Sequence, residues 1–278
     1  MEREIRTDER SGVLYPENLA RYGARWFEPD AAVAAVVESL WSVRWNFNPG
    51  ESITQRIIAT PGVTLTIEAG DVPGPLIVTG VHRRAWERDI AGSGTVFGIR
   101  LRPAGLAVVS DLSPERIADA TLPVTPDLDP RLFELLTRIA VATTTHAHAD
   151  AANAVLPELL AERPVPAPHR LANAVVAALT PGGAPVDGPT LARRFGVSER
   201  TIQRALRGTL GQGPKWVGRW VRLQEVARLL SAPDPPDVAA VAVSLGYTDQ
   251  AHLVNDFRTA VGLTPGAYVR SLRRLQGG

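Results

Sequence analysis

The last third of the chain contains an internal repeat, and this repeat limits the possible folds more than any other feature of the sequence. Small, apolar, glycine and proline positions recur after 50 or 51 residues. The first copy contains Ala192, Phe195, Gly196, Ile202, Leu206, Gly211 and Pro214, and the second contains Ala242, Leu245, Gly246, Leu253, Phe257, Gly262 and Pro265. Because the apolar positions follow three- and four-residue steps, each copy predicts helices rather than strands. We therefore expect one helical unit to occur twice.

Each copy carries the signals of two short helices joined by a tight turn. Gly196 and Gly246 permit the positive φ angle that ends a first helix. Ser198 and Asp249 stand where a side chain can cap the second helix. The second helices each bury one apolar stripe, made of Ile202 and Leu206 or of Leu253 and Phe257. The pattern predicts helix-turn-helix units at about 187–209 and 237–260.

A longer helix is predicted between the two units, over about 214–231. It ends before Pro233, which cannot continue a helix. Its apolar stripe consists of Trp216, Trp220, Leu223, Ala227 and Leu230. We expect this helix to fix the separation of the two units.

The chain divides near Pro164, where composition and charge both change. Pro164, Pro166 and Pro168 alternate with other residues, which predicts an extended linker over 163–168. Residues 1–164 carry 16 Lys and Arg against 22 Asp and Glu, whereas residues 165–278 carry 14 against 7. A basic domain suits a polyanion such as DNA, although a merely solvated basic surface explains the charge equally well. We therefore predict two domains, 1–164 and 165–278.

The first domain is predicted to be rich in β-strands. Apolar residues alternate with polar ones over 63–68 and again over 97–102, as in half-buried strands, and turn-rich segments separate such runs. From about 130 to 162 the spacing becomes helical. The expected fold class is α+β with two domains: a β-rich cupin-like barrel or sandwich followed by helices, then an all-α domain with two helix-turn-helix units.

The free face of the first unit's second helix is suited to reading DNA. It presents Glu199, Arg200, Gln203, Arg204 and Arg207. Arginine can donate two hydrogen bonds to guanine and glutamine can pair with adenine in the major groove. An ordinary arginine-rich exposed helix would show the same pattern, but two copies with matching glycines and prolines favour DNA binding. Two reading helices on one face of a duplex must lie about 34 Å apart.

The run GVSERTIQRALRGTLGQGPKWVGRWVRLQEVARLL, followed by VAAVAVSLGYTDQAHLVNDFRTAVGLTPGAYVR, resembles the DNA-binding domain of AraC/XylS transcriptional regulators. The resemblance covers about Leu171 to Arg274. It implies a transcriptional regulator, either an activator or a repressor, that binds promoter DNA and contacts RNA polymerase. It places base-reading positions at Arg200, Gln203, Arg204, Gln250, Ala251, His252 and Asn255. It places phosphate contacts at Arg193, Arg194, Arg207 and Arg258.

The second unit departs from the pattern of the first. Asn255 stands where relatives often have a basic residue, and Ala251 offers only a methyl group. Asp256 adds a negative charge that phosphate would repel if the side chain faced the DNA backbone. We therefore expect the first unit to supply more of the specificity and the second to contribute mainly positioning.

The segments TPGVTLTIEAGD and FGIRLRPAG more loosely resemble sensor-like N-terminal domains of AraC-type regulators. The resemblance implies a compact β-fold that takes a small effector or pairs two subunits into a homodimer. The candidate effector-binding residues are Trp41, Trp45, His82, Trp86 and Arg100. A tryptophan in a β-domain is more often part of the core than of a cavity, and a surface or interdomain role fits Arg100 as well.

Several classes of function are excluded or disfavoured. The chain has no cysteine, which excludes disulfides, thiolate zinc sites and cysteine nucleophiles. His146 and His148 stand two residues apart in a segment that is not a strand, so we expect neither a metal nor a cofactor. No run of about eighteen apolar residues is present and the first residues are charged, so we expect a cytoplasmic protein without membrane contact.

No nucleophile motif or phosphate-binding glycine loop is present, and we expect no enzymatic activity. The alternative is an enzyme or carrier in which the β-domain works on a small molecule and the DNA-binding domain only localises it.

Overall fold

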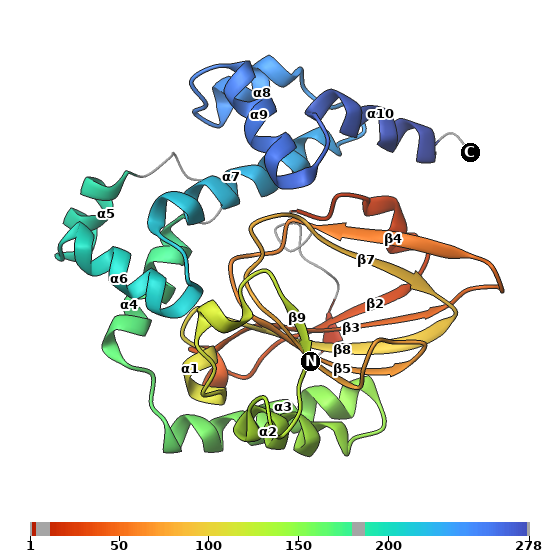
Figure 1. Cartoon of the computed structure of the whole chain (residues 1–278), viewed down its shortest axis with the longest axis vertical. Coiled ribbons are helices and arrows are strands. Elements are labelled where there is room, and N and C mark those ends of the chain that lie inside the picture. Colours follow the sequence, from red (N-terminus) through yellow and green to blue (C-terminus); the bar gives the residue numbers. More distant parts are fainter. Residues whose placement is uncertain (1, 4–11, 180–186, 277–278) are drawn as a thin grey trace.

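The computed structural model describes residues 2–3, 12–179 and 187–276. It consists of a β-sheet domain with helices on one face and a row of helices that follows it along the chain (Figure 1). No helix in these described ranges has the length and apolarity that crossing a membrane requires. The expected α+β class with a β-rich first domain and an all-helical second domain is confirmed.

The N-terminal domain contains a seven-stranded antiparallel sheet and a separate two-stranded sheet. The strand order of the large sheet is β1 (Glu2–Arg3), β2 (Gly23–Phe27), β3 (Val37–Asn46), β8 (Ser93–Leu101), β5 (Thr64–Gly70), β6 (Leu76–Thr79) and β9 (Thr121–Pro123). The small sheet pairs β4 (Ser52–Ile57) with β7 (Trp86–Ala91). The two strands predicted from alternation are β5 and β8, and they are neighbours, with Leu65 opposite Ile99.

The two faces of the large sheet are covered by different elements (Figure 1). One face packs its apolar side chains against α2 (Pro130–Ala140) and α3 (Thr145–Glu162), which form the predicted helical segment. The other face packs against β4 and β7. There Arg88 of β7 pairs with Glu68 of β5 at 3.0 Å, and its guanidinium lies over the Trp45 ring of β3 at 6.0 Å. The domain is therefore a three-layer arrangement of helices, sheet and small sheet.

The second domain is a row of helices. They are α4 (Ala167–Leu179), α5 (Gly188–Phe195), α6 (Glu199–Leu210), α7 (Pro214–Leu230), α8 (Val238–Ser244), α9 (Gln250–Val261) and α10 (Pro265–Gln276). The helices α5 and α6 form the first predicted unit, α8 and α9 form the second, and α7 is the predicted connecting helix. Short helical turns, η1 (Pro16–Ala20), η2 (Ala31–Val33), α1 (Leu106–Val109) and η3 (Pro114–Ile117), lie in the first domain.

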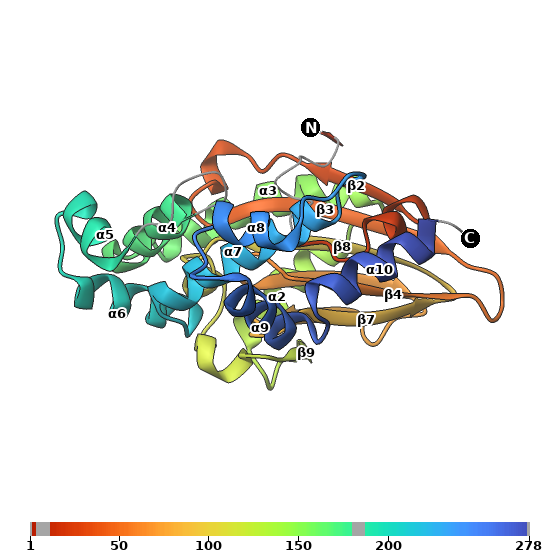
Figure 2. The ribbon, with the colours of Figure 1, turned by 90° about the horizontal axis from the view of Figure 1, so that it is seen from above.

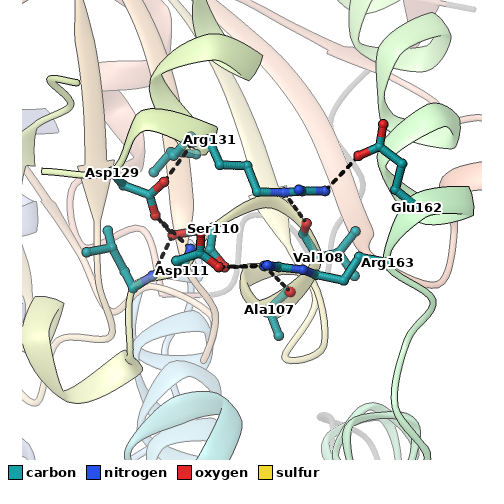
Figure 3. Close-up of polar contacts among 10 residues, drawn as sticks. Ala107, Val108, Ser110, Asp111, Asp129, Arg131, Glu162 and Arg163 are labelled. Atoms are coloured by element: carbon teal, nitrogen blue, oxygen red, sulfur yellow. Dashed lines mark hydrogen bonds and ion pairs between the residues drawn. The ribbon is translucent and has the colours of Figure 1, made fainter. Parts of the chain in front are cut away.

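The predicted proline linker is shorter than expected. α4 already begins at Ala167, because Pro168 lies in the first turn, where a helix needs no proline N–H. The remaining segment is held in place, since Arg163 donates to the carbonyls of Ala107 and Ser110 at 3.3 and 3.2 Å and pairs with Asp111 at 2.7 Å (Figure 3). Extended backbone is therefore limited to 163–166. The domain boundary near Pro164 stays a prediction.

Candidate nucleic-acid interface

The turn of each unit is built as its local sequence predicts. Gly196 and Gly246 have φ angles of 63° and 69°, which end the first helices. The Ser198 hydroxyl accepts a hydrogen bond from the Thr201 amide at 3.1 Å, and the Asp249 carboxylate accepts one from the His252 amide at 2.7 Å. Both second helices therefore begin at a side-chain cap, and the predictions for these four positions are confirmed.

The helix α6 presents its polar face to solvent. Ile202 and Leu206 are buried in a core shared with α4 and α5. All the predicted DNA-contacting residues of this unit are exposed: Arg193, Arg194, Arg200, Gln203, Arg204 and Arg207. Arg193 also donates to the Thr190 hydroxyl at 2.9 Å, and the Arg194 guanidinium lies over the Phe195 ring at 5.8 Å. The first unit thus exposes a face rich in guanidinium groups.

The helix α9 has the same arrangement with fewer charges. Leu253 and Phe257 are buried. The predicted DNA-contacting residues of this unit are all exposed: Gln250, Ala251, His252, Asn255 and Arg258. Arg258 donates to the Asn255 side-chain oxygen at 3.2 Å, which leaves the Asn255 NH2 as the donor of that side chain. Viewed from above, α6 and α9 lie toward the same edge of the molecule (Figure 2).

Asp256 does not face the exposed side of α9 on which the predicted DNA-contacting residues lie. Its carboxylate accepts a hydrogen bond from Arg219 of α7 at 2.6 Å, and the Tyr247 hydroxyl lies 3.4 Å away. The repulsion of phosphate considered from the sequence therefore does not arise. Sequence reasoning missed this pair because Arg219 and Asp256 are 37 residues apart and no local pattern links them.

The structure confirms the apolar stripe that was predicted for α7. Trp216 and Trp220 stack with ring centroids 5.0 Å apart, and Trp220 is 1% exposed. Leu223, Ala227 and Leu230 are buried on the same helix. The residues of this stripe pack into the cores of both units, so α7 joins the two units through side-chain packing as well as through the chain.

Three of the five candidate effector residues lie on the sheet face that packs against β4 and β7. Trp41, Trp45 and Arg100 alternate with the core residues of β3 and β8, and the two indole rings lie over Gly98 and Gly94. Trp45 is buried and donates its indole N–H to the Ala91 carbonyl at 2.9 Å, so this side chain is core. Within the described ranges, the Trp41 Nε1 and the Arg100 Nε are buried without a hydrogen-bond partner.

The other two candidates lie between β3 and β8 in the sequence: Trp86 is the first residue of β7, and His82 precedes that strand. The Trp86 indole donates to the Thr121 hydroxyl at 3.3 Å. His82 is next to Asp119, and burial lowers the pKa of the imidazole despite that carboxylate. Trp41 and Arg100 are therefore diagonal neighbours on one face of the large sheet, whereas Trp86 belongs to the small sheet and His82 lies in the segment before it.

A cavity of about 460 Å³ lies where the first domain meets α6. It is lined by residues of α1 and η3, by Arg163 and His169, and by Gly208 and Thr209 of α6. The sequence offered no signal for it, because its walls come from three separate segments. His146 and His148 lie on α3 beside Phe27 and Phe97, and no cluster of three metal-ligating side chains occurs among the residues that the structure describes.

Comparisons with known proteins match separate parts of the chain. A family model described as a helix-turn-helix domain matches residues 191–271, and one described as a domain of unknown function (DUF6597) matches residues 25–123. The HTH-type transcriptional regulator GlxA of Rhizobium meliloti (strain 1021) is 36% identical over 93 residues, which are 34% of this chain and 27% of that protein. An AraC-like transcription regulator of Streptomyces antibioticus is 37% identical over 79 residues, which are 28% of this chain and 25% of that protein. The match thus spans about a quarter of the length of these curated relatives.

Solved structures also show similarity. An AraC family transcriptional regulator from Rhodopseudomonas palustris CGA009 is 27% identical, with a TM-score of 0.32 over 37% of this chain and 93% of that chain. ToxT from Vibrio cholerae is 7% identical, with a TM-score of 0.40 over 79% of this chain and 97% of that chain. The helix-turn-helix model and the two regulator relatives, taken with the tandem units, support the resemblance of this chain to the AraC/XylS family of transcriptional regulators.

Proposed function

We propose that this chain regulates transcription by reading two adjacent major grooves of promoter DNA with α6 and α9. The observation that carries the proposal is the exposed polar face that each of these helices presents beside a buried apolar stripe. Arg200, Gln203 and Arg204 are the groups of α6 that can pair with base edges. Of the α9 side chains, Gln250 and Asn255 offer amide groups for the same purpose.

The first unit supplies most of the specificity in this proposal. α6 exposes two arginines and a glutamine in its first two turns, whereas the exposed face of α9 includes Ala251 and an Asn255 whose oxygen is already engaged by Arg258. The exposed Arg193, Arg194, Arg207 and Arg258 are suited to phosphates, since they need no particular base. The protein is then a binding protein without catalytic activity.

The test compares Arg204→Ala with Arg194→Ala in the full chain. A preferred site is first selected from random duplexes with the wild-type protein. Arg204→Ala should lose about 1 to 3 kcal/mol of binding free energy at that site and relax its base preference there. Arg194→Ala should weaken binding to all sequences alike and lower the slope of log affinity against log salt by about one.

The control for a lost positive charge is Arg44→Ala, since Arg44 is an exposed arginine of β3 in the first domain. Arg44→Ala should leave the affinity for the selected site and the affinity for random DNA unchanged. Equal losses for Arg204→Ala on the selected site and on random DNA would contradict the assignment of Arg204 to base reading. A wild-type chain that selects no site would contradict the proposal as a whole.

The first domain is proposed to respond to a small molecule that carries an oxygen acceptor, such as a carboxylate. Supporting this, Trp41 and Arg100 occupy neighbouring positions on one sheet face, and each has a buried N–H group without a partner among the described residues. Buried donors in native proteins normally have an acceptor. Such an effector would act by favouring one arrangement of the two domains. Pairing of two chains through this domain and contact with RNA polymerase stay predictions.

A further inference from the structure

The first domain contributes side chains to the hydrophobic cores of both helix-turn-helix units. Val81, between β6 and β7, packs into the core formed by α4, α5 and α6. Leu14 and Ile58 pack into the core of α7, α8, α9 and α10. All three residues are at most 5% exposed. Since these cores are also what hold α6 and α9 in place, the first domain is part of the support of both reading helices.

Two buried hydrogen bonds join the first domain to α7. The Trp220 indole donates to the Ala59 carbonyl at 2.6 Å, and the Gln224 amide donates to the Ile58 carbonyl at 2.9 Å. Gln224 is 3% exposed, and leaving a buried amide without a partner is costly. The contact therefore favours one orientation of α7 on the first domain, in a way that apolar packing alone does not.

The first domain also caps the end of α9. The last carbonyls of a helix have no partner within it. At α9, Arg56 of β4 donates to the Val261 carbonyl at 2.6 Å, and the Ala85 amide donates to the Ala260 carbonyl at 2.8 Å. A guanidinium at this position also interacts favourably with the helix dipole. Arg56 is itself oriented by Glu87, whose carboxylate lies 2.6 Å from its Nε.

The end of α6 meets the same domain at a different place. Gly211, which ends α6, lies against Pro114 of η3, so that a Cβ added to the glycine would stand 3.8 Å from the proline. Gly208 and Thr209 of α6 form one wall of the 460 Å³ cavity described above. Each reading helix is thus contacted at its C-terminal end by the first domain, through separate segments.

We infer that the first domain is a brace that sets the separation and angle of α6 and α9, and that Arg56 is a positioning residue for α9. The inference rests on the proposed reading of two grooves, because a brace has a purpose only if both helices must engage DNA together. When two binding elements are linked, their joint affinity depends on whether the linkage holds them at the separation of their sites. A loosened brace should therefore change how strictly the protein selects the spacing of its two half-sites.

The first test needs no DNA, so that it stays decisive if the proposed function fails. The chain has no cysteine, and spin labels can be attached through Gln203→Cys on α6 and Ala251→Cys on α9, both exposed positions. The distance between the labels is measured by double electron–electron resonance in the full chain. A single narrow distance distribution is expected, unchanged by Arg44→Ala and broadened or shifted by Arg56→Ala. A narrow distribution that Arg56→Ala leaves unchanged overturns the brace.

The second test measures binding to duplexes that differ in spacing. The site selected by the wild-type chain is compared with the same site carrying one inserted base pair between its halves. The wild type and Arg44→Ala should lose about tenfold or more in affinity on insertion, and Arg56→Ala less than about threefold. A loss of stability alone would lower affinity for both spacings by one factor and leave their ratio unchanged, which would contradict the inference.

Gln224→Met provides an independent variant, should Arg56→Ala fail to fold. It keeps a side chain of similar volume on α7 and removes only the hydrogen bond to Ile58. Like Arg56→Ala, it should broaden the distribution of distances between the two labels. It should also reduce the ratio of the affinity for the selected site to the affinity for the site with one inserted base pair. Arg56→Lys, which retains a cation near the α9 carboxyl end, should restore part of the wild-type ratio.

Discussion

At the scale of single residues, one buried carboxylate organises the region where the first domain meets the rest of the chain. Asp129 is 2% exposed and accepts hydrogen bonds from the Ser110 hydroxyl, from the Asp111 amide at 2.7 Å and from the Leu132 amide at 2.9 Å (Figure 3). The last of these caps α2. Asp129 thereby ties the start of α2 to the segment that also receives Arg163.

Asp129→Ala should lower the free energy of unfolding at pH 7 by about 3 kcal/mol, because a cap and two further hydrogen bonds to a charged acceptor are lost. Burial alone would raise the pKa of Asp129, but these hydrogen bonds bring it below its ordinary value. A lowered pKa means that the carboxylate stabilises the fold above about pH 4, and that this contribution is lost as the pH falls through the folded-state value.

Urea unfolding from pH 7 down to pH 2.5 checks both parts of this prediction. The difference between the wild type and Asp129→Ala should shrink at the acid end. Asp127→Ala, at an exposed aspartate two residues earlier, serves as the control and should be nearly neutral at every pH. A constant difference across the pH range would contradict the role of the charged carboxylate.

At the scale of elements, the close packing of β3 on β8 depends on glycine. Trp41 and Trp45 lie opposite Gly98 and Gly94 in the register, and their rings occupy the space where side chains of β8 would stand. A Cβ at Gly98 would come within 2.2 Å of the Trp41 ring, whereas a Cβ at Gly196 would meet nothing within 4 Å. Gly98 is thus required because the Trp41 ring occupies the space of a side chain, whereas Gly196 is required because of its positive φ angle.

Gly98→Ala should displace the Trp41 ring, with a loss of about 1 to 3 kcal/mol in unfolding free energy from overpacking. The near-ultraviolet circular dichroism spectrum should change as well, and this change should be absent when Trp41→Phe is already present. Gly196→Ala should cost about 1 to 2 kcal/mol through its φ angle alone and leave the spectrum unaltered. Identical spectra for wild type and Gly98→Ala would show that the ring does not rest on the glycine.

At the scale of the whole molecule, a half-buried ionisable side chain lies between the two domains. Glu17 of η1 has both carboxylate oxygens buried without a hydrogen-bond partner in the described ranges, and it interacts electrostatically with Tyr268 of α10. Burial raises the pKa of Glu17, and burial, with the nearby Glu17, also raises that of Tyr268. The charged form of Glu17 therefore opposes the docking of η1 against α10.

A raised carboxyl pKa means that folding is favoured while the group is protonated, and that this advantage is lost as the pH rises above the unfolded value of about 4.3. Glu17→Gln should therefore stabilise the chain at pH 7 by up to about 1 kcal/mol, with a smaller gain at pH 4.5, since partial solvation limits the effect. Thermal unfolding of the wild type and of Glu17→Gln at pH 7 and at pH 4.5 measures this gain in stability. Glu115→Gln, at an exposed glutamate, is the control, and an equal gain at both pH values would contradict the prediction.

The local sequence by itself determined the helix-turn-helix units, their caps and their exposed faces. Helical periodicity, the glycines with positive φ and the caps at Ser198 and Asp249 all act within one or two turns, so their partners are near in the chain. The alternation that marked β5 and β8 is local in the same sense, although their pairing is not. The linker was predicted too long because Pro168 forbids the middle of a helix and permits its first turn.

Only the tertiary structure decided which residues of the two domains contact one another. Arg56 and Val261 are 205 residues apart, Gln224 and Ile58 are 166 apart, and no short pattern can specify such a pair. Three further features could not be predicted from the sequence for the same reason. They are the direction of the Asp256 side chain, the cavity beside α6, and the packing of the two tryptophan rings on Gly94 and Gly98. Local propensity specifies which residues form a helix or a strand, whereas the partners of a buried polar group depend on which distant segments the folded chain brings together.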